Sequence, residues 1–354
     1  MRKAEERKGT TEQIHGGDIY RHPEVRDFSV NSNPLGPPKG VIQALEESLG
    51  EIARYPDMRC EKLRKAIGQF EQVPPEAVLC GNGAAELFFA AAWAQKPRKG
   101  LVTAPAFSEY ERALVAAGGQ TEFYKLREEQ EFEIGADFLE RIDPEVDLVF
   151  LCSPNNPTGW PLEREFVKEA LERCRTCGAR LVLDECFIDF LEDPGKYEAR
   201  NLIREYPELL VVKAFTKSFA MPGLRLGYAL CGDPKFLKRM QEMLQPWNVS
   251  LPAQVAGVAA LQEAEGYLEE SRKVVARGRA FLREGLEACG FPVYGSRANY
   301  VFFRGRPGLY REALAAGFLI RDCGNYRGLP DGFFRVAVRT EEENERLMAW
   351  LRRS

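Results

Sequence analysis

Lys217 and the residues after it form the part of the sequence best suited to covalent chemistry. Residues 214–228 read AFTKSFAMPGLRLGY, so the lysine is followed by Pro222-Gly223 and then by Arg225. A lysine amine can form a Schiff base with an aldehyde. An arginine about two helical turns further on can grip a phosphate through two parallel hydrogen bonds, after Pro222 and Gly223 have broken the helix. A buried lysine or arginine more often forms an ion pair with an acidic residue, so this interpretation depends on other motifs.

Two of those motifs follow apolar runs that are typical of buried parallel strands. Asp184 follows Leu181–Leu183, and the loop SPNNPTG (153–159) follows residues 147–152. Ligands of open α/β sheets bind at the carboxyl ends of the strands. There Asp184 could keep a pyridine nitrogen protonated, and Asn156 could donate to a phenolic oxygen. The alternatives are a helix cap for Asp184 and an ordinary turn around Asn156.

The sequence GNGAAE (81–86) lies between the expected strand 77–80 and the expected helix 87–94. A glycine-rich turn before a helix presents free N–H groups and the helix dipole to a phosphate, here through Gly83, Ala84 and Ala85. A dinucleotide-binding dehydrogenase is disfavoured because the turn lacks the third glycine of that motif. A Schiff-base lysine, a pyridine partner, a phenolic-oxygen donor and a phosphate turn together indicate pyridoxal 5′-phosphate.

These four motifs, in this order, resemble the fold-type I aminotransferase superfamily over nearly the whole chain. Within it the sequence is most similar to L-threonine-O-3-phosphate decarboxylases, which serve cobalamin synthesis, and histidinol-phosphate aminotransferases are the sister family. Phe187 matches the decarboxylases, since the aminotransferases typically have tyrosine there. The other matching segments lie near the two ends of the chain: 15–19, 27–36, 54–57, 296–300, 319–326 and 334–339.

The resemblance implies a role for each matching residue. Lys217 and Asp184 would be the catalytic residues. The cofactor would be held by Gly83, Ala84, Ala85, Phe107, Asn156, Asp184, Lys217, Arg225 and Tyr55, with Phe107 stacked on the pyridine ring. The substrate would contact His15, Asn31, Asn156, Arg321 and Arg335, with Arg335 on the α-carboxylate.

The resemblance also implies a homodimer, because Tyr55 would reach the cofactor phosphate of the neighbouring subunit. The family usually has a hydroxyl residue at the position of Ala214, and Ala85 likewise carries no hydroxyl. The phosphate is therefore expected to depend more on backbone N–H groups, Arg225 and Tyr55.

The expected activity is decarboxylation of L-threonine O-3-phosphate to 1-amino-2-propanol phosphate. The alternative is an aminotransferase that acts on histidinol phosphate or another amino acid, because both reactions begin in the same way and differ in the bond broken at Cα. A non-catalytic regulator that keeps this fold is a further alternative. It is disfavoured by the intact set of Lys217, Asp184, Asn156 and Arg225.

The pattern of elements predicts an α/β protein, and the resemblance implies fold type I of the enzymes that depend on pyridoxal 5′-phosphate (PLP). We expect an arm over residues 1–40 that packs on the small domain, a large cofactor-binding domain over 41–245 with a mostly parallel sheet and helices on both faces, and a smaller α+β domain over 246–354. A chain of 354 residues is long enough for two domains.

Composition and charge narrow the possible partners, the cellular location and the chance of a metal site. The net charge of -4 gives no reason to expect nucleic acid or an anionic membrane as a partner. The odd count of 9 cysteines and the lack of an apolar export signal favour the cytoplasm. With only 2 histidines we expect no metal site, and the spacing of Cys174 and Cys177 is expected to be chance.

Overall fold

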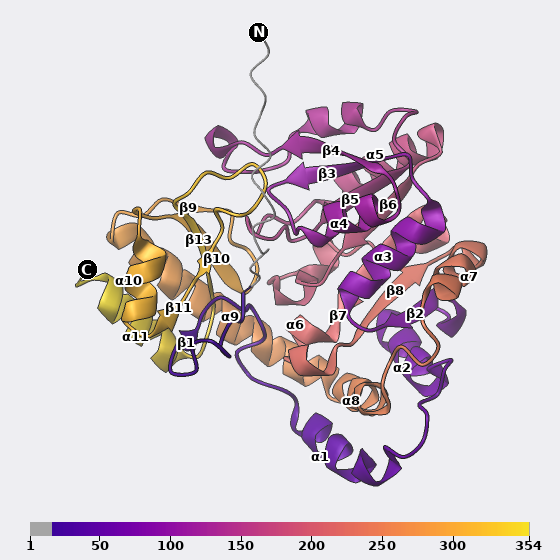
Figure 1. Ribbon diagram of the computed structural model, residues 1–354, viewed down its shortest axis with the longest axis horizontal. Helices are drawn as coiled ribbons and strands as arrows, with labels where there is room; N and C mark the ends of the chain where they lie inside the picture. The colour runs from indigo at the N-terminus through magenta and orange to yellow at the C-terminus, as the bar shows by residue number, and fades with distance from the viewer. Residues whose placement is uncertain (1–15, 354) are drawn as a thin grey trace.

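The computed structural model describes residues 16–353, and a seven-stranded sheet forms its larger part (Figure 1). Strand β8 runs antiparallel to both of its neighbours, and the other paired strands are parallel. The strand order is β2 (Val78–Gly81), β8 (Gly227–Cys231), β7 (Leu209–Ala214), β6 (Arg180–Asp184), β5 (Leu148–Cys152), β3 (Lys99–Ala104) and β4 (Gln120–Lys125). The predicted mostly parallel α/β sheet is confirmed.

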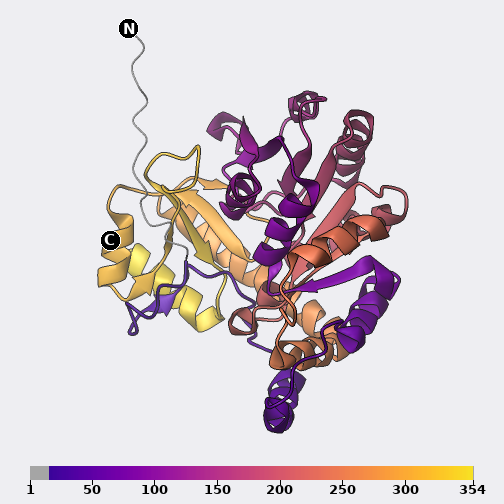
Figure 2. The same cartoon turned by 45° about the vertical axis from the view of Figure 1, so that its right-hand side comes forward.

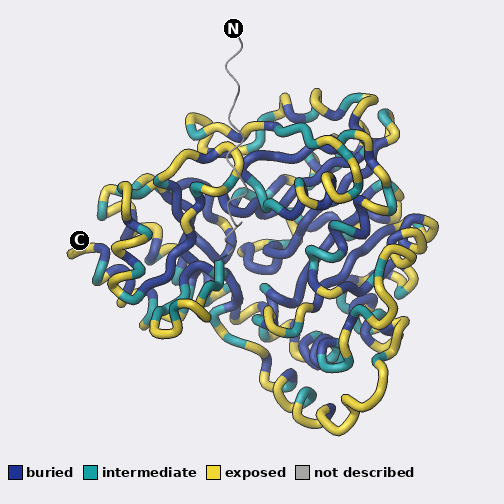
Figure 3. The backbone as a smooth tube through the Cα atoms, viewed as in Figure 1, coloured by how far each residue is buried: buried dark blue, intermediate teal, exposed yellow. Residues whose placement is uncertain are grey.

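Helices cover both faces of this sheet, which explains why its strands are continuous apolar runs. Along β5, Leu148 and Phe150 pack into one core while Val149 and Leu151 pack into the other. Figure 3 shows the strands as the buried centre of the molecule. The first core contains residues of α3 (Ala84–Gln95), α4 (Glu109–Ala116) and α7 (Pro234–Met243); the second contains residues of α2 (Glu61–Glu71), α5 (Arg164–Cys177) and α8 (Leu251–Gln262).

A second, antiparallel sheet lies beside the first, at the left of Figure 1. Its order is β12 (Arg321–Asp322), β13 (Phe333–Ala337), β10 (Tyr300–Arg304) and β9 (Val293–Tyr294). Three helices belong to this part of the chain: α9 (Ala264–Ala288), α10 (Leu309–Ala315) and α11 (Glu341–Leu351). A capping box between Thr340 and Glu343 fixes the start of α11.

The amino-terminal arm joins the two sheets (Figures 1 and 2). Strand β1 (Arg26–Asp27) pairs with β11 (Phe318–Leu319), and the Phe28 carbonyl accepts a hydrogen bond from the N–H of Ala337 at 2.8 Å. The chain then crosses toward the large sheet and forms α1 (Lys39–Ser48), which packs on α8. The domain boundaries at residues 40 and 245 stay predictions. Among residues 16–353, no helix is both long and apolar enough to cross a bilayer.

Candidate active site

Asp184 ends β6 at the carboxyl edge of the sheet, as the sequence predicted. Its Oδ2 accepts a hydrogen bond of 2.5 Å from the Tyr110 hydroxyl, and its Oδ1 accepts one of 2.9 Å from the Cys186 N–H. Burial raises the pKa of the Asp184 carboxyl above its ordinary value, although these hydrogen bonds oppose the shift. The two contacts fix the carboxylate in place, so it can face a ligand's ring nitrogen without rotating.

Lys217 lies on α6 (Phe215–Ser218), directly after β7. The arm holds this turn, because the Asn33 N–H donates to the Lys217 carbonyl at 3.1 Å and the Asn33 side chain donates to the Ser218 carbonyl at 2.8 Å. The Lys217 Nζ lies 3.4 Å from Asn31 Oδ1 and 5.9 Å from the centre of the Phe187 ring. Burial, together with the charge of Arg335, lowers the pKa of Lys217 to about 8. A larger share of this amine is therefore neutral and nucleophilic near neutral pH.

Arg225 reaches the glycine-rich turn by a different path from the one expected. Helix α6 ends at Ser218, so two helical turns do not separate the residues; a 3-10 turn at Pro222–Leu224 leads into Arg225, which has a positive φ of 56°. A Cβ added to Gly83 would lie only 2.8 Å from the Arg225 Nη2. Gly83 has a φ of +82° and precedes α3, so the guanidinium faces the free N–H groups at the start of that helix. This arrangement suits a phosphate.

Asn156 and Arg335 are brought together from the two sheets. The Asn156 Oδ1 accepts hydrogen bonds from the Arg335 Nη1 and from the Tyr326 hydroxyl, the latter at 3.2 Å. These bonds orient the amide, which leaves the Asn156 Nδ2 free to donate to another group. The Arg335 Nη2 donates to the Ser29 carbonyl at 2.7 Å.

Arg321 and Arg335 are direct cross-strand neighbours on β12 and β13. Both side chains are buried, and within residues 16–353 neither forms an ion pair. The Arg335 Nε is also buried without a hydrogen-bond partner in the described chain. The Arg321 Nη2 donates to Asn325 Oδ1 at 2.8 Å, and its guanidinium lies 5.2 Å from the centre of the Tyr326 ring. Like charges placed directly opposite one another are unfavourable, so this pair is suited to a ligand with two anionic groups.

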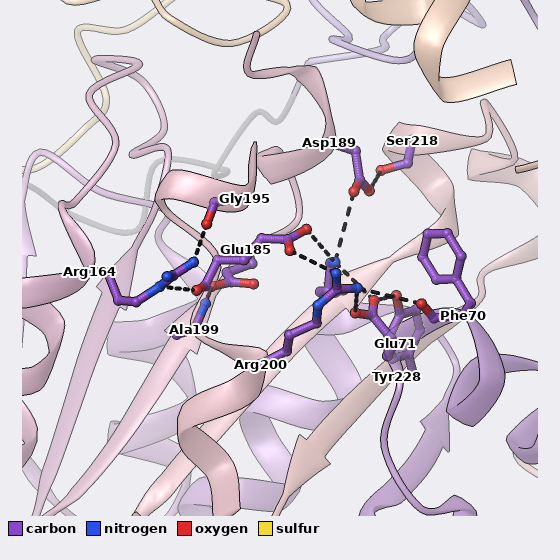
Figure 4. Close-up of polar contacts among 12 residues, drawn as sticks. Phe70, Glu71, Arg164, Glu185, Asp189, Gly195, Ala199, Arg200, Ser218 and Tyr228 are labelled. Carbon is purple, nitrogen blue, oxygen red and sulfur yellow. Dashed lines mark hydrogen bonds and ion pairs between the residues drawn. The ribbon is translucent and has the colours of Figure 1, made fainter. Parts of the chain in front are cut away.

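A buried network of charged residues lies next to α6, and no sequence pattern predicted it (Figure 4). The Ser218 hydroxyl donates to Asp189 Oδ2 at 2.6 Å, and the Lys213 Nζ lies 3.8 Å from Asp189 Oδ1 and 2.8 Å from Glu71 Oε1. Glu71, in turn, accepts hydrogen bonds from Tyr228 and Arg200. The network therefore anchors the residue after Lys217 to strand β7 and helix α2.

The remaining predicted residues are less central in the described chain. Phe107 is half-buried and packs edge-on against Tyr110, with ring centres 5.8 Å apart. Ala85 lies in the first turn of α3. Tyr55 is 78% exposed and stacks on Trp247 at 4.5 Å. His15 lies outside the described residues. Sequence reasoning missed the contact of Tyr110 with Asp184, although Tyr110 follows Phe107 by only three positions.

The assembled residues fit pyridoxal 5′-phosphate. The Arg225 guanidinium, which packs on Gly83, and the N–H groups at the start of α3 would take the phosphate, and Asp184 would pair with the ring nitrogen. Asn156 has a free donor for the phenolic oxygen, and Lys217 has the lowered pKa that a Schiff-base lysine needs.

Comparison with known proteins agrees with this geometry. The model of the family "Aminotransferase class I and II" matches residues 23–351. Threonine-phosphate decarboxylase from Salmonella typhimurium is 37% identical over 349 residues, which cover 96% of this chain and 95% of the relative. Histidinol-phosphate aminotransferase from Desulfitobacterium hafniense is 34% identical, with 92% and 91% covered.

Solved structures lead to the same family. The crystal structure of the histidinol-phosphate aminotransferase from Clostridium acetobutylicum matches with a TM-score of 0.86 and 30% identity, over 92% of this chain and 97% of the other. The resemblance inferred from the four motifs is thus confirmed, and so is the fold. The chain belongs to the aminotransferase class I and II family, whose enzymes use pyridoxal 5′-phosphate.

Proposed function

We propose that this protein decarboxylates L-threonine O-3-phosphate to 1-amino-2-propanol phosphate. The observation that carries the proposal is the buried pair of arginines, Arg321 and Arg335, neither of which has an acidic partner in the described chain. A substrate that bears a carboxylate at one end and a phosphate at the other gives each guanidinium an anion. Arg335, which lies beside Asn156, would take the carboxylate, and Arg321 would take the phosphate.

The residues around Cα would decide which bond breaks. The cofactor would supply an electron sink for the pair of electrons released at Cα. Arg321 and Arg335 would fix the two ends of the substrate and so orient the Cα–carboxylate bond toward that sink. Loss of carbon dioxide would leave the bonding electron pair at Cα, where a proton would replace the carboxylate. Lys217 is the nearby buried amine that can hold and deliver this proton.

Phe187 supports decarboxylation over transamination. Its ring packs edge-on against Tyr300, with centres 5.2 Å apart, and lies 5.9 Å from the Lys217 Nζ. A phenylalanine offers no hydroxyl here, whereas the aminotransferase sister family typically has tyrosine. The Salmonella relative is named a threonine-phosphate decarboxylase, which agrees with this choice. His15 and Asn31 remain proposed phosphate contacts, and Asn31 is buried with an unpartnered Nδ2 in the described chain.

A homodimer with shared sites is part of the proposal. Tyr55 is 78% exposed, so its side chain is available to a second subunit. The exposed apolar side chains around it would be covered by a second copy: Leu49, Ile52, Met58 and Trp247. Figure 3 shows this region, between α1 and α2, as mostly exposed backbone.

Turnover of L-threonine phosphate tests the function. We expect release of carbon dioxide, a product with the mass of 1-amino-2-propanol phosphate, and little activity on unphosphorylated threonine. Efficient conversion of histidinol phosphate and 2-oxoglutarate to glutamate, with L-threonine phosphate left intact, would establish the aminotransferase alternative instead.

A further inference from the structure

Cys60 and Cys80 bring two free thiols together from separate elements of the large domain. Cys60 is the residue that caps the start of α2, and Cys80 lies on strand β2. Both cysteines are free, and their side chains are in hydrogen-bonding contact with one another. Because all of α2 separates the two residues in sequence, the fold creates this pair of thiols.

A cavity of about 260 Å³ reaches both cysteines. It lies between the start of α2, strand β2 and helix α7. Its charged lining residues are three bases and one acid: Arg59, Arg64, Lys238 and Glu76. A positive balance of charge favours a thiolate over a thiol. Each cysteine is only 5% exposed, so the reagents that can reach the pair are small molecules that enter this cavity.

The two thiols differ in acidity. The hydrogen bond with Cys80, assisted by the charge of Arg64, lowers the pKa of Cys60. Burial and the charge of Asp57, whose carbonyl oxygen lies 3.6 Å from the Cys60 Sγ, oppose this shift. The start of α2 adds a helix dipole that favours negative charge at Cys60. The same hydrogen bond, together with burial, raises the pKa of Cys80 well above its ordinary value. Cys60 is therefore the better nucleophile, and Cys80 is the thiol that donates to it.

We propose that Cys60 and Cys80 form an oxidation site, which becomes a disulfide when a small hydroperoxide enters the cavity. A nucleophilic thiolate beside a second thiol is the arrangement that this chemistry requires. Sulfur atoms in hydrogen-bonding contact can reach the disulfide bond length of about 2 Å through rotation of the two side chains.

The oxidation would proceed in two steps that balance. The Cys60 thiolate attacks one peroxide oxygen, the O–O bond breaks, and the departing oxygen takes up a proton and leaves as water or an alcohol. The Cys80 sulfur then attacks the sulfur of the Cys60 sulfenic acid, so that the S–S bond forms and water leaves. Together the two thiols lose two protons and two electrons, which reduce the hydroperoxide.

Hydrogen peroxide added to the native protein, followed by alkylation of the remaining thiols and peptide mapping without reductant, tests the proposal. The native assembly is used because Met58, which also lines the cavity, belongs to the region that a second copy would cover. We expect one new cross-linked pair of peptides, containing Cys60 and Cys80, that a thiol reductant separates. Cys60→Ser should abolish the cross-link. Cys289→Ser is the matched control and should keep it, because Cys289 is a partly exposed free thiol that does not line the cavity.

The order of the two steps has a separate readout. In Cys80→Ala, the oxidation should stop at the sulfenic acid of Cys60, which dimedone labels, whereas Cys60→Ser should show no dimedone on Cys80. Dimedone on Cys80 in place of Cys60 would overturn the assignment of the nucleophile.

Three results on the unaltered protein would overturn the oxidation site itself: two thiols that stay reduced, oxidation to sulfinic acid without a cross-link, or pairing of either residue with a different cysteine. Circular dichroism would establish that the variants fold; if one does not, the peptide map of the unaltered protein still decides. These measurements need no turnover, so their failure would leave the proposed decarboxylase activity untouched.

Discussion

At the scale of single residues, the site is a group of cationic side chains that form no ion pair with an acidic residue in the described chain. Lys217, Arg225, Arg321 and Arg335 gather near the carboxyl edge of the large sheet, while Asp184 is engaged by Tyr110. Burial and these like charges disfavour protonation of the lysine. An anionic substrate would reduce the repulsion among these cations. Substrate binding would therefore also change the electrostatic environment of the reactive lysine.

The lowered pKa of Lys217 predicts its reactivity in the cofactor-free protein. Labelling by an amine-specific reagent, followed at the Lys217 peptide by mass spectrometry, should rise with pH with a midpoint of about 8, against 10.5 for an ordinary lysine. Arg335→Met should move the midpoint upward, because it removes a neighbouring cation. The exposed Arg304 provides the control, Arg304→Met. A midpoint near that of surface lysines would contradict the buried environment described here.

Arg321→Gln should weaken binding of the phosphorylated substrate while leaving the cofactor in place. The loss of one charge-assisted hydrogen bond, worth about 1.5–3 kcal/mol, corresponds to a rise in KM of roughly 10- to 150-fold. Arg327→Gln is the matched control, because Arg327 lies in the loop that follows β12 but is exposed and paired with Glu111. Loss of pyridoxal phosphate from Arg321→Gln, or equal KM values for the two variants, would argue against a substrate role.

At the scale of elements, the segment 185–200 connects strand β6 to the network beside α6. Glu185 is buried; its Oε1 accepts a hydrogen bond of 2.8 Å from the Ala199 N–H, and its Oε2 has no partner in the described chain (Figure 4). Burial raises the pKa of Glu185 to about 8, despite the nearby charge of Lys213. This segment therefore carries a buried carboxyl that stays protonated at neutral pH.

Glu185→Gln should change how stability depends on pH. The pKa of Glu185 is raised from 4.5 to about 8, so the folded protein binds more protons than the unfolded chain between these values, and its stability falls as the pH rises through this range. Glutamine keeps the acceptor for Ala199 and cannot ionise. The free energy of unfolding should thus match the original protein only below pH 4.5, the unfolded pKa, and exceed it near pH 8.

Urea unfolding at a series of pH values would measure this difference. Glu169→Gln, at an exposed position of α5, is the control and should leave the pH profile unchanged. Parallel profiles for Glu185→Gln and the original protein would show that the buried carboxyl does not titrate in this range.

Sequence patterns predicted β5 and β6 of the large sheet well, because a strand buried on both faces is a continuous apolar run, whereas the partly exposed edge strand β4 was not predicted. The end of β6 at Asp184 and the end of β5 at Cys152 agree with expectation. The partners of Ser218, the residue after Lys217, could not be predicted, because Asn33 and Asp189 reach α6 from segments remote in sequence or connected by irregular turns. The length of helix α6 was overestimated, because tertiary contacts rather than helical periodicity stabilise this helix.

At the scale of the whole molecule, the exposed aromatic pair of Tyr55 and Trp247 is the feature that a single chain leaves unexplained. Tyr55→Phe should leave a dimer by light scattering and weaken pyridoxal phosphate binding by about 1 kcal/mol, the typical net value of one hydrogen bond. Tyr20→Phe is the control, since Tyr20 is 94% exposed.

Mixed subunits give a stricter test of shared sites. Lys217→Ala and Tyr55→Ala chains, refolded together, should form heterodimers in which one site has both residues intact, so the mixture should recover cofactor binding that the parent proteins lack. A monomer in solution, or no recovery on mixing, would contradict a site built from two subunits.

The arm also sets an order of events during synthesis. Residues 26–28 pair with Leu319 and Ala337, which are translated long after the arm. These arm residues therefore lack their partners until the segment 319–337 has been made, and Asn33, which contacts α6, belongs to the same arm. A nascent chain released before that segment would keep the strands of the large sheet yet lack the strands that hold the arm beside Lys217.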